Sequence, residues 1–456
     1  MADTVIKKGY DIKLVGKPSN DLVEAANASS VSVYPREFEP VKLRLLVNEG
    51  DDVKRGTTLF FDKRDDRMKY RSPAAGKVRS IVRGPRRFVE QIIIDVAQDE
   101  DAEPLQSYNP GDIAGLERQA LCNYLADTGM LPLILERPFS RIASLDTPPK
   151  SIFVNAMNTA PFQVDSNVAL DGEELTFQAG LDALTCLTQG AVHLCMDGRV
   201  SSPAAALVKA ANVQMHTFRG PHPAGNSSVH IAAVDPIAPG DTVWTIKAPD
   251  VALIGRLLLN GMVPHTQVVA LGGPGVREDA RKHYRIRIGS DLRTVLEGTL
   301  EDGEQRVIWG DALSGVTIEA DSYARFYGRS ITVLNEGRER MLMGWLEPGF
   351  KRLSFTRAYL SGWRNGDKRW NLTTNMNGGL RAMVLTEHYD KVMPLNIMVD
   401  YLVRAVLADD TDEAIQLGIL EIDPEDFALC EYICPCKMEL QTIVRKGLDL
   451  IQEEGL

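Results

Sequence analysis

The sequence predicts an α/β protein built from several domains. Three observations lead to this fold class: short strands with tight turns over residues 36–97, helices alternating with strands over residues 110–260, and helices again after about residue 385. At 456 residues the chain exceeds one ordinary domain, so roughly two to four compact units are expected. Hydrophobic residues at 44% and charged residues at 25% match globular averages, which excludes disordered and collagen-like classes.

Charge and cysteine usage narrow the function classes. The net charge of -11 argues against a nucleic-acid binder, because phosphate contacts need a basic face. No apolar run approaches the roughly 20 residues that a membrane-spanning helix needs, and residues 1–9 lack the apolar core of a signal peptide. Six cysteines in so long a chain make no disulfide framework, so a cytosolic location is expected and any membrane role is peripheral.

Residues 36–97 alternate short period-two segments with glycine-containing turns, which predicts a small β-barrel. The phrases G-D-D-V-K-R-G-T-T-L and P-A-A-G-K-V resemble those of lipoyl and biotinyl carrier domains. The resemblance implies a modified lysine at a hairpin tip, but Lys69 is too near Pro73 for that position and Lys63 is too far from it. We therefore expect a barrel that serves as a scaffold rather than as a swinging arm.

The following segments are predicted from hydrophobic periodicity and from flanking turn residues. In the α/β part, helices are expected at residues 115–130, 177–189, 202–213 and 250–262, and strands at 151–157, 191–195 and 230–234. From residue 267 the pattern is mostly β, with strands at 284–289, 306–309 and 330–334. Further helices are expected at 395–407, 411–417 and 437–453.

Two loops that follow strands are candidate ligand sites, because parallel sheets bind ligands at their carboxyl edge. The loop R-G-P-H-P-A-G-N-S-S-V-H-I, residues 219–231, offers His222 and His230 as donors that titrate near neutral pH. A ligand site and a rigid connector with a packed histidine fit this pattern equally well. The run G-G-P-G at residues 272–275 lacks the spacing of a nucleotide motif, so a structural turn is expected there rather than a phosphate cradle.

The segment E-R-P-F-S-R, residues 136–141, places Phe139 between Arg137 and Arg141. An aromatic face beside guanidinium donors suits a flat, carbonyl-bearing ring such as a quinone, through stacking and hydrogen bonds to its oxygens. The alternative is a solvated arginine pair with Phe139 in a local core. On the sequence alone, the alternative is favoured.

The stretch P-E-D-F-A-L-C-E-Y-I-C-P near the end of the chain holds half of an iron–sulfur motif. A bacterial ferredoxin run is C-x2-C-x2-C-x3-C-P, and Cys430 and Cys434 supply its last two cysteines. The first two positions hold Phe427 and Pro424, which cannot ligate iron, so no cluster is predicted. Cys436 adds a thiol but completes no standard zinc spacing. Three further cysteines are expected to be buried thiols: Cys122, Cys186 and Cys195.

Many specific phrases occur in one order along nearly the whole chain. They include I-K-K-G-Y-D-I, V-N-E-G-D-D-V-K-R-G-T-T-L-F-F-D-K, S-P-A-A-G-K-V, E-R-P-F-S-R, G-P-H-P-A-G, R-E-R-M-L-M-G-W, S-F-T-R-A-Y-L-S, V-M-P-L and E-D-F-A-L-C-E-Y-I-C-P-C-K. On these phrases the chain closely resembles the NqrA family of the Na+-translocating NADH:quinone oxidoreductase. That family is related to the RnfC family of Rnf-type complexes, which carries complete ferredoxin runs, so Cys430 and Cys434 resemble the remains of a lost cluster site.

The resemblance implies a domain layout. It consists of a barrel-sandwich hybrid (lipoyl-like) domain at residues 1–105, a Rossmann-like α/β domain at 106–261, a soluble-ligand-binding β-grasp domain at 262–335, a β-rich connecting segment at 336–384, and a helical C-terminal domain at 385–456 that resembles a degenerate ferredoxin-like domain.

The resemblance also implies a role. Family members are peripheral subunits on the cytoplasmic face of the bacterial inner membrane, in a six-subunit pump that passes electrons from NADH to ubiquinone and exports sodium. NADH, flavins and iron–sulfur centres are expected in partner subunits, and the isolated chain is expected to carry no covalent cofactor and no redox activity.

Quinone binding is associated with the family, and the expected contacts are Phe139 by stacking, Arg141 and His222 as donors, and Gly225 in the same loop as His222. Two alternatives are an assembly subunit without a small ligand, and a dinucleotide- or flavin-binding enzyme. The last alternative needs a glycine fingerprint that the sequence lacks.

Overall fold

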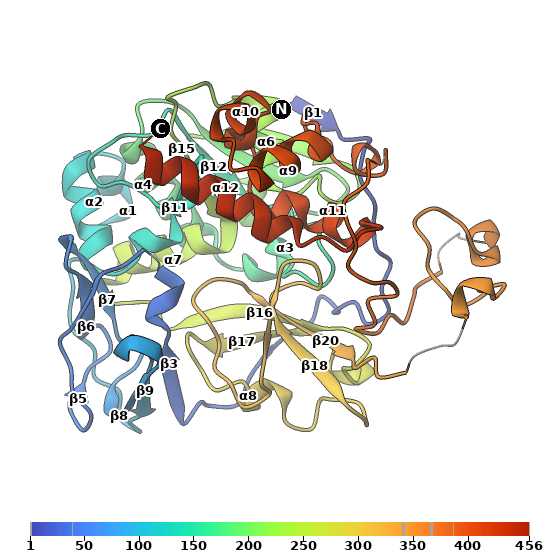
Figure 1. Cartoon of the computed structure of the whole chain (residues 1–456). Helices are drawn as coiled ribbons and strands as arrows, with labels where there is room; N and C mark the ends of the chain where they lie inside the picture. The colour runs from blue at the N-terminus through green and yellow to red at the C-terminus, as the bar shows by residue number, and fades with distance from the viewer. Residues whose placement is uncertain (1, 39, 340–342, 365–367, 386, 456) are drawn as a thin grey trace.

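The computed structural model describes residues 2–38, 40–339, 343–364, 368–385 and 387–455. It contains four sheets and a group of C-terminal helices, which confirms the predicted α/β multidomain class (Figure 1). The barrel occupies one lower corner of Figure 1, with the α/β domain above it and the β-grasp domain beside it. The C-terminal helices, coloured red, lie across the α/β domain.

The barrel packs a four-stranded sheet, ordered β3-β9-β8-β5, against a three-stranded sheet, ordered β4-β6-β7. Its core is aromatic, and the buried rings of Phe60 and Tyr70 stack with their centroids 4.6 Å apart. The strands are β3 (Ser30–Val33), β4 (Leu43–Leu45), β5 (Asp52–Val53), β6 (Thr58–Asp62), β7 (Asp65–Arg71), β8 (Gly76–Arg83) and β9 (Val89–Val96).

The two lysines considered as carrier positions lie in different surroundings. Lys69 Nζ is 2.5 Å from Asp127 Oδ1, so its side chain joins the barrel to the helix that ends at Asp127. Lys63 is exposed in the turn between β6 and β7. Lys69 therefore has a structural role between domains.

The first two strands of the chain pair outside the two sheets of the barrel. Strand β1 (Ala2–Val5) pairs in parallel with a strand of the α/β sheet, and β2 (Leu22–Glu24) pairs in parallel with a strand of the β-grasp sheet. Both strands are short and find their partners some 200 residues or more along the chain, at positions such as His216 and His283. Local periodicity cannot reveal such a pairing. The segment ties three domains together.

The α/β domain contains a seven-stranded sheet ordered β1-β14-β13-β12-β15-β10-β11. Strands β14, β13, β12 and β15 are parallel, and the strand order reverses between β12 and β15. The elements are α1 (Pro110–Ile113), α2 (Arg118–Asp127), β10 (Leu135–Arg137), β11 (Arg141–Ile142), β12 (Ser151–Asn155), α3 (Ser166–Ala169), α4 (Glu174–Leu187), β13 (Val192–Asp197), α5 (Ala205–Val208), β14 (Gln214–Arg219), α6 (Ser227–Val234), β15 (Val243–Lys247) and α7 (Ala248–Asn260).

Two predicted elements of this domain are wrong. The strand expected at 230–234 is the second half of helix α6, whose residues Ser227–Ile231 are all buried. Residues 230–234 are almost all apolar, so their pattern does not separate helix from strand. The helix expected at 202–213 is reduced to the single turn α5, which ends at Val208, and Asn212, at φ 62°, then precedes β14.

The β-grasp domain contains a six-stranded sheet ordered β19-β18-β20-β16-β17-β2. The glycine run at its centre is a structural turn, as the sequence favours: the Gly273 N–H donates to Gly16 O at 2.8 Å, and the Gly275 N–H donates to Val333 O at 3.1 Å. These amides are used by the backbone and not by a phosphate. The elements are β16 (Thr266–Gly272), β17 (His283–Arg287), α8 (Arg293–Leu296), β18 (Gln305–Trp309), β19 (Val316–Ile318) and β20 (Ser330–Asn335).

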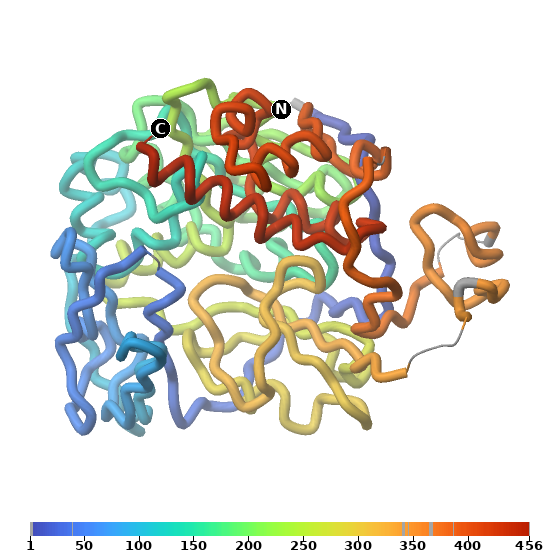
Figure 2. The backbone as a smooth tube through the Cα atoms, viewed as in Figure 1, coloured from blue at the N-terminus to red at the C-terminus, as the bar shows by residue number. Residues whose placement is uncertain are grey.

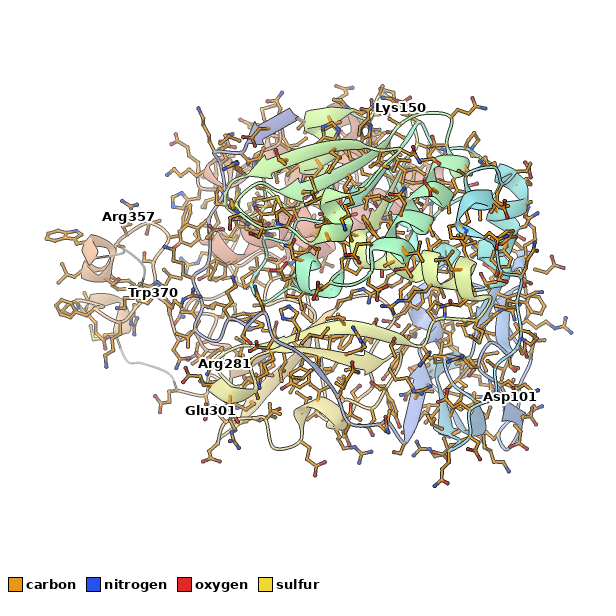
Figure 3. The ribbon with its side chains drawn as sticks, turned by 180° about the vertical axis from the view of Figure 1, so that it is seen from behind. Asp101, Lys150, Arg281, Glu301, Arg357 and Trp370 are labelled. Atoms are coloured by element: carbon orange, nitrogen blue, oxygen red, sulfur yellow. The ribbon has the colours of Figure 1, made fainter. Side chains whose placement is uncertain are left out.

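The described part of residues 336–384 is not β-rich, contrary to the expectation from the resemblance. It holds 3-10 helices at Gly344–Leu346 and Leu360–Arg364, with single β-bridges elsewhere. Residues 343–364 project from the body in Figure 2, and Arg357 marks this projection in Figure 3. Phe350 and Trp363, two large apolar side chains of this projection, are 66% and 84% exposed. Part of the phrase R-E-R-M-L-M-G-W, residues 340–342, lies outside the described residues.

The three expected C-terminal helices are present as α9 (Val399–Leu407), α10 (Thr411–Gln416) and α12 (Leu440–Glu454), and a fourth, short helix that was not predicted, α11 (Ala428–Ile433), precedes α12. They share one apolar core, to which α12 contributes Val444, Leu448 and Ile451. In the part of the chain that the structure describes, no helix combines the length and the apolar character needed to cross a membrane.

Candidate functional site

The carboxyl ends of β12 and β15 form the edge at which open α/β sheets bind their ligands. The two strands end side by side, because their last residues, Asn155 and Lys247, are register partners. Asn155 Nδ2 donates to Gly225 O at 2.8 Å and to Ser227 Oγ at 3.1 Å. The polar loop that the sequence singled out is thereby fixed at this edge of the sheet.

A segment of the C-terminal domain covers the same edge. The 3-10 helix η9 (Pro424–Phe427) follows Asp423, whose side chain forms a reciprocal capping box with that of Asp426. Asp426 is 2% exposed and accepts a hydrogen bond from Asn226 Nδ2 at 2.8 Å. Because Asn226 immediately precedes helix α6, a carboxylate of this chain binds at the start of that helix.

Arg137 places a positive charge beside these carboxylates. Its Nη1 donates to Ser228 Oγ at 2.8 Å and lies 3.9 Å from Asp423 Oδ2. The side chain is buried, and its Nε and Nη2 have no hydrogen-bond partner among the described residues. Burial raises the pKa of Glu425 to about 7 and also raises the pKa of Asp426, although Arg137 opposes both shifts. The edge is therefore filled by acid groups of the chain itself.

His222 and Gly225, two of the expected quinone contacts, lie together around Thr159. Thr159 Oγ1 is 3.0 Å from His222 Nδ1 and accepts a hydrogen bond from the Gly225 N–H at 3.0 Å. His222 is buried, and its Nε2 has no hydrogen-bond partner in the described ranges. Burial lowers the pKa of His222 to about 4, although Asp311 and Asp11 oppose the shift. The imidazole is therefore neutral at neutral pH.

We expect His222 to make the fold sensitive to acid. The ring ordinarily titrates at pKa 6.5 and in the fold at about 4, so as the pH falls the unfolded state binds a proton first. The contribution to stability is complete above pH 6.5 and declines toward pH 4, by about 1–2 kcal/mol between pH 7 and pH 5. Urea unfolding across this range measures the decline, and His222→Gln is expected to reduce its slope. An unchanged slope would assign the dependence to other buried histidines, such as His230.

Phe139 and Arg141, the other expected quinone contacts, are engaged by helix α12. Arg141 Nη2 lies 2.5 Å from Asp449 Oδ1, and Arg141 Nε donates to Gln452 Oε1 at 3.2 Å. Arg445 Nη1 donates to the Phe139 carbonyl oxygen at 2.9 Å, and the half-buried Phe139 ring packs against the C-terminal core. These contacts agree with the local-core interpretation of Phe139. The Arg141 guanidinium forms an interdomain ion pair.

The half iron–sulfur motif is packed inside the C-terminal domain. Cys430 is 1% exposed and Cys434 and Cys436 are 0% exposed, and Cys434 Sγ lies 2.9 Å from Tyr389 Oη. Burial raises the pKa of Cys430 and keeps it as a thiol, and Phe427, at a missing-ligand position, is fully buried. Within the described residues, no cluster of three or more His, Cys, Asp or Glu side chains is arranged to hold a metal ion. Of the other cysteines, two are buried as predicted and one is half-buried: Cys122 and Cys195, and Cys186.

The buried polar cluster of Arg137, Asn226 and Asp426 was not predicted from the sequence. Two of its members adjoin predicted quinone contacts, since Arg137 lies in the same segment as Phe139 and Asn226 follows Gly225. The available signal was the acidic run D-P-E-D at residues 423–426, which interrupts a largely apolar stretch. Carboxylates inside an apolar stretch indicate a buried, paired role.

Three family models match the chain, one for each of its first three domains. They are the NqrA N-terminal barrel-sandwich hybrid domain over residues 4–97, the NqrA second alpha/beta domain over 116–263, and the NQRA C-terminal domain over 268–320. The matched domains define the class, which is a multidomain subunit of an NADH-quinone reductase.

Curated relatives carry the same assignment over the full length. The NqrA subunit of the Na(+)-translocating NADH-quinone reductase of Saccharophagus degradans is 39% identical, covering 99% of each chain. The corresponding subunits of Alcanivorax borkumensis and Vibrio alginolyticus are 37% and 36% identical, again over 99% of each chain. This chain belongs to the NqrA family of Na(+)-translocating NADH-quinone reductase subunits.

A solved structure aligns more distantly. It is the air-oxidised NAD+-reducing nickel–iron hydrogenase, at 10% identity and a TM-score of 0.38 over 76% of this chain and 68% of that one.

Proposed function

We propose that this chain is the peripheral, cytoplasmic-side subunit of a six-subunit Na+-translocating NADH:ubiquinone reductase. It supports electron transfer from NADH to ubiquinone, coupled to sodium export, by holding partner subunits in place. NADH, the flavins and the iron–sulfur centres lie in those partners. The names of the relatives support membership of the complex.

The observation that carries the structural part of this proposal is the filled edge of the α/β sheet. A dinucleotide would place its pyrophosphate near the ends of β12 and β15. The Asn226 side chain there already donates a hydrogen bond to Asp426, and Asp423 and Glu425 lie on the same segment as Asp426. Phosphate and these carboxylates repel each other, so nucleotide binding would require removal of the whole C-terminal segment.

The test is purification of the complex through a tag on another subunit, from cells with and without this chain. Without it, we expect the remaining subunits to co-purify incompletely and NADH-to-ubiquinone turnover to be lost, while NADH oxidation by an artificial acceptor persists. The purified chain itself is expected to be colourless. Full quinone turnover without the chain, or a flavin spectrum in the purified chain, would contradict the proposal.

A second function, quinone binding by this subunit, is favoured by one observation. The buried Nε2 of His222 has no partner in the described part of the chain, so it is available to a carbonyl oxygen, with Gly225 adjacent and Phe139 as the candidate stacking ring. Titration of the purified chain with a ubiquinone analogue is expected to saturate. Loss of saturation in His222→Ala and Phe139→Ala, with Arg141→Lys unaffected because Arg141 pairs with Asp449, is the expected pattern. Absence of saturable binding in the unmodified chain would contradict this function.

A further inference from the structure

Among the described residues, the edge of one barrel strand has no partner strand. The outer edge of β3 is covered by the β-grasp domain, since the Ser32 N–H donates to Gly289 O at 2.7 Å. The outer edge of β7 faces helix α2, where Arg71 Nη2 is 2.6 Å from Asp127 Oδ2. Beyond the two-residue β5, the Arg55 N–H donates to Asp101 O at 3.0 Å, on the side marked by Asp101 in Figure 3.

Strand β4 is different from these three. It ends its sheet and pairs on one side only, with β6. The barrel is also unequal, with four strands in one sheet and three in the other. A fourth strand in the smaller sheet would lie beside β4. An uncovered edge of this kind presents backbone donors and acceptors to another chain.

A groove of about 630 Å³ runs along β4. Its floor is apolar, with Leu43, Leu45, Phe88 and Val89 among the lining residues. All five charged side chains that line it are basic: Lys42, Arg44, Lys63, Arg83 and Arg87.

The charge of the groove is opposite to that of the chain. All five basic side chains are exposed, and across the described residues none of them forms an ion pair. The whole chain carries a net charge of -11, so a group of unpaired positive charges is not expected from its overall composition. Like charges gathered in one groove repel one another, and an anionic occupant relieves this repulsion.

Protection against aggregation does not account for the whole arrangement. Lysine on an edge strand is a common way to block unwanted pairing, and Lys42 just before β4 and Arg44 on β4 are sufficient for that purpose. Lys63 comes from the β6–β7 turn, and Arg83 and Arg87 come from the β8–β9 hairpin. Three separate chain segments thus direct the same charge into one groove.

We propose that this groove binds an extended, acidic segment of a partner subunit, which adds a strand to the open edge of β4. Main-chain hydrogen bonds to the edge supply affinity, and carboxylates that alternate with apolar side chains match the basic rim and the apolar floor. The five residues 41–45 accommodate a partner stretch of about 16 Å, at roughly 3.3 Å per residue. A phospholipid headgroup satisfies the charges but not the strand edge. The inference relies on the proposed complex for the partner, and it does not depend on quinone binding.

The experiment uses the intact complex and zero-length carbodiimide coupling, which condenses an amine with a carboxylate only when the two are in contact. Lys42 and Lys63 are the amine reporters in the groove. We expect mass spectrometry to find amide cross-links from Lys42 or Lys63 to aspartate or glutamate in one short stretch of another subunit. An assembled complex with no such cross-link would overturn the proposal.

A matched pair of variants tests specificity while keeping both reporters. Arg44→Glu with Arg87→Glu reverses two rim charges, and the cross-link yield is expected to fall roughly tenfold, since each exposed charge pair changes affinity by a few-fold. Lys17→Glu with Lys209→Glu makes the same change in net charge at exposed positions outside the groove and is expected to leave the yield unchanged. Equal yields from both variants would overturn the proposal.

Vesicles of phosphatidylglycerol distinguish the competing occupant. If the purified chain binds them and the Arg44/Arg87 variant does not, while the complex gives no protein cross-link from Lys42 or Lys63, the groove is a lipid site and the proposal fails. Failure of the complex to contain this chain at all would instead refute the proposed function.

Discussion

Replacing Arg137 with methionine is expected to lower the free energy of unfolding by about 3–5 kcal/mol, the range for removing one partner of a buried charge pair. Arg137 is 2% exposed and is the cation nearest Asp423 in this cluster, at 3.9 Å. Without it, the buried Asp426 and the partly buried Asp423 have less compensation. Because the Asp426 carboxyl, whose pKa burial already raises, then favours its protonated form further, the loss is expected to be larger at pH 8 than at pH 5.

Urea unfolding of the purified chain measures this effect. The matched control is Arg141→Met, which removes an ion pair whose Arg141 and Asp449 side chains are 27% and 39% exposed, and is expected to cost less than about 1 kcal/mol. The double variant Arg137→Met with Asp426→Asn is expected to recover part of the loss, because it removes a buried charge together with its partner. Equal effects of Arg137→Met and Arg141→Met would contradict the role of Arg137.

Gly255→Ala is expected to destabilise the α/β domain by about 3 kcal/mol, at the upper end of the usual cost of overpacking. Helices α4 and α7 approach so closely that a Cβ on Gly255 would lie 1.7 Å from Thr176 O. A Cβ on the facing Gly180 would lie 2.1 Å from Val251 O. Both obstacles are helix backbone, which cannot rotate away as a side chain can, so the two helices must separate.

Gly111→Ala is the matched control, since Gly111 also lies in a helix and a Cβ there meets no atom within 4 Å. Its effect is expected to stay within about 0.5 kcal/mol. Thermal or urea unfolding compares the two variants. Similar midpoints for Gly255→Ala and Gly111→Ala would show that the helices adjust without cost.

The sequence predicted those parts of the fold whose information is local. The barrel turns, helices α4 and α7, and the three predicted C-terminal helices α9, α10 and α12 all appear, because each has its own period or turn residues. The second half of helix α6 was predicted wrongly as a strand because residues 230–234 are almost all apolar and include no polar face to set a period. Strands β1 and β2 were not predicted, because each pairs with a strand that lies far along the chain.

In the candidate site too, the sequence predicted the residues that lie close together in the chain and not the contacts between distant segments. His222 and Gly225 were found from one loop, and the structure brings them together around Thr159. Arg141 could not be placed, because its partner Asp449 is 308 residues away in sequence. The contact between Asn226 and Asp426 spans 200 residues and joins two domains. No spacing in the sequence encodes such a contact.

The position of β1 and β2 has a consequence for how the protein is made. Ribosomes release residues 2–24 before the barrel strands, yet β1 completes its pairing only after Arg219 has emerged, and β2 only after Arg285. At roughly 5–20 residues per second, the wait is on the order of ten to sixty seconds. During that time the leading segment has no native partner and is open to chaperones and proteases. Synthesis that stops early, after the barrel, leaves this segment permanently unpaired, so residues that are translated early are among the last to be secured.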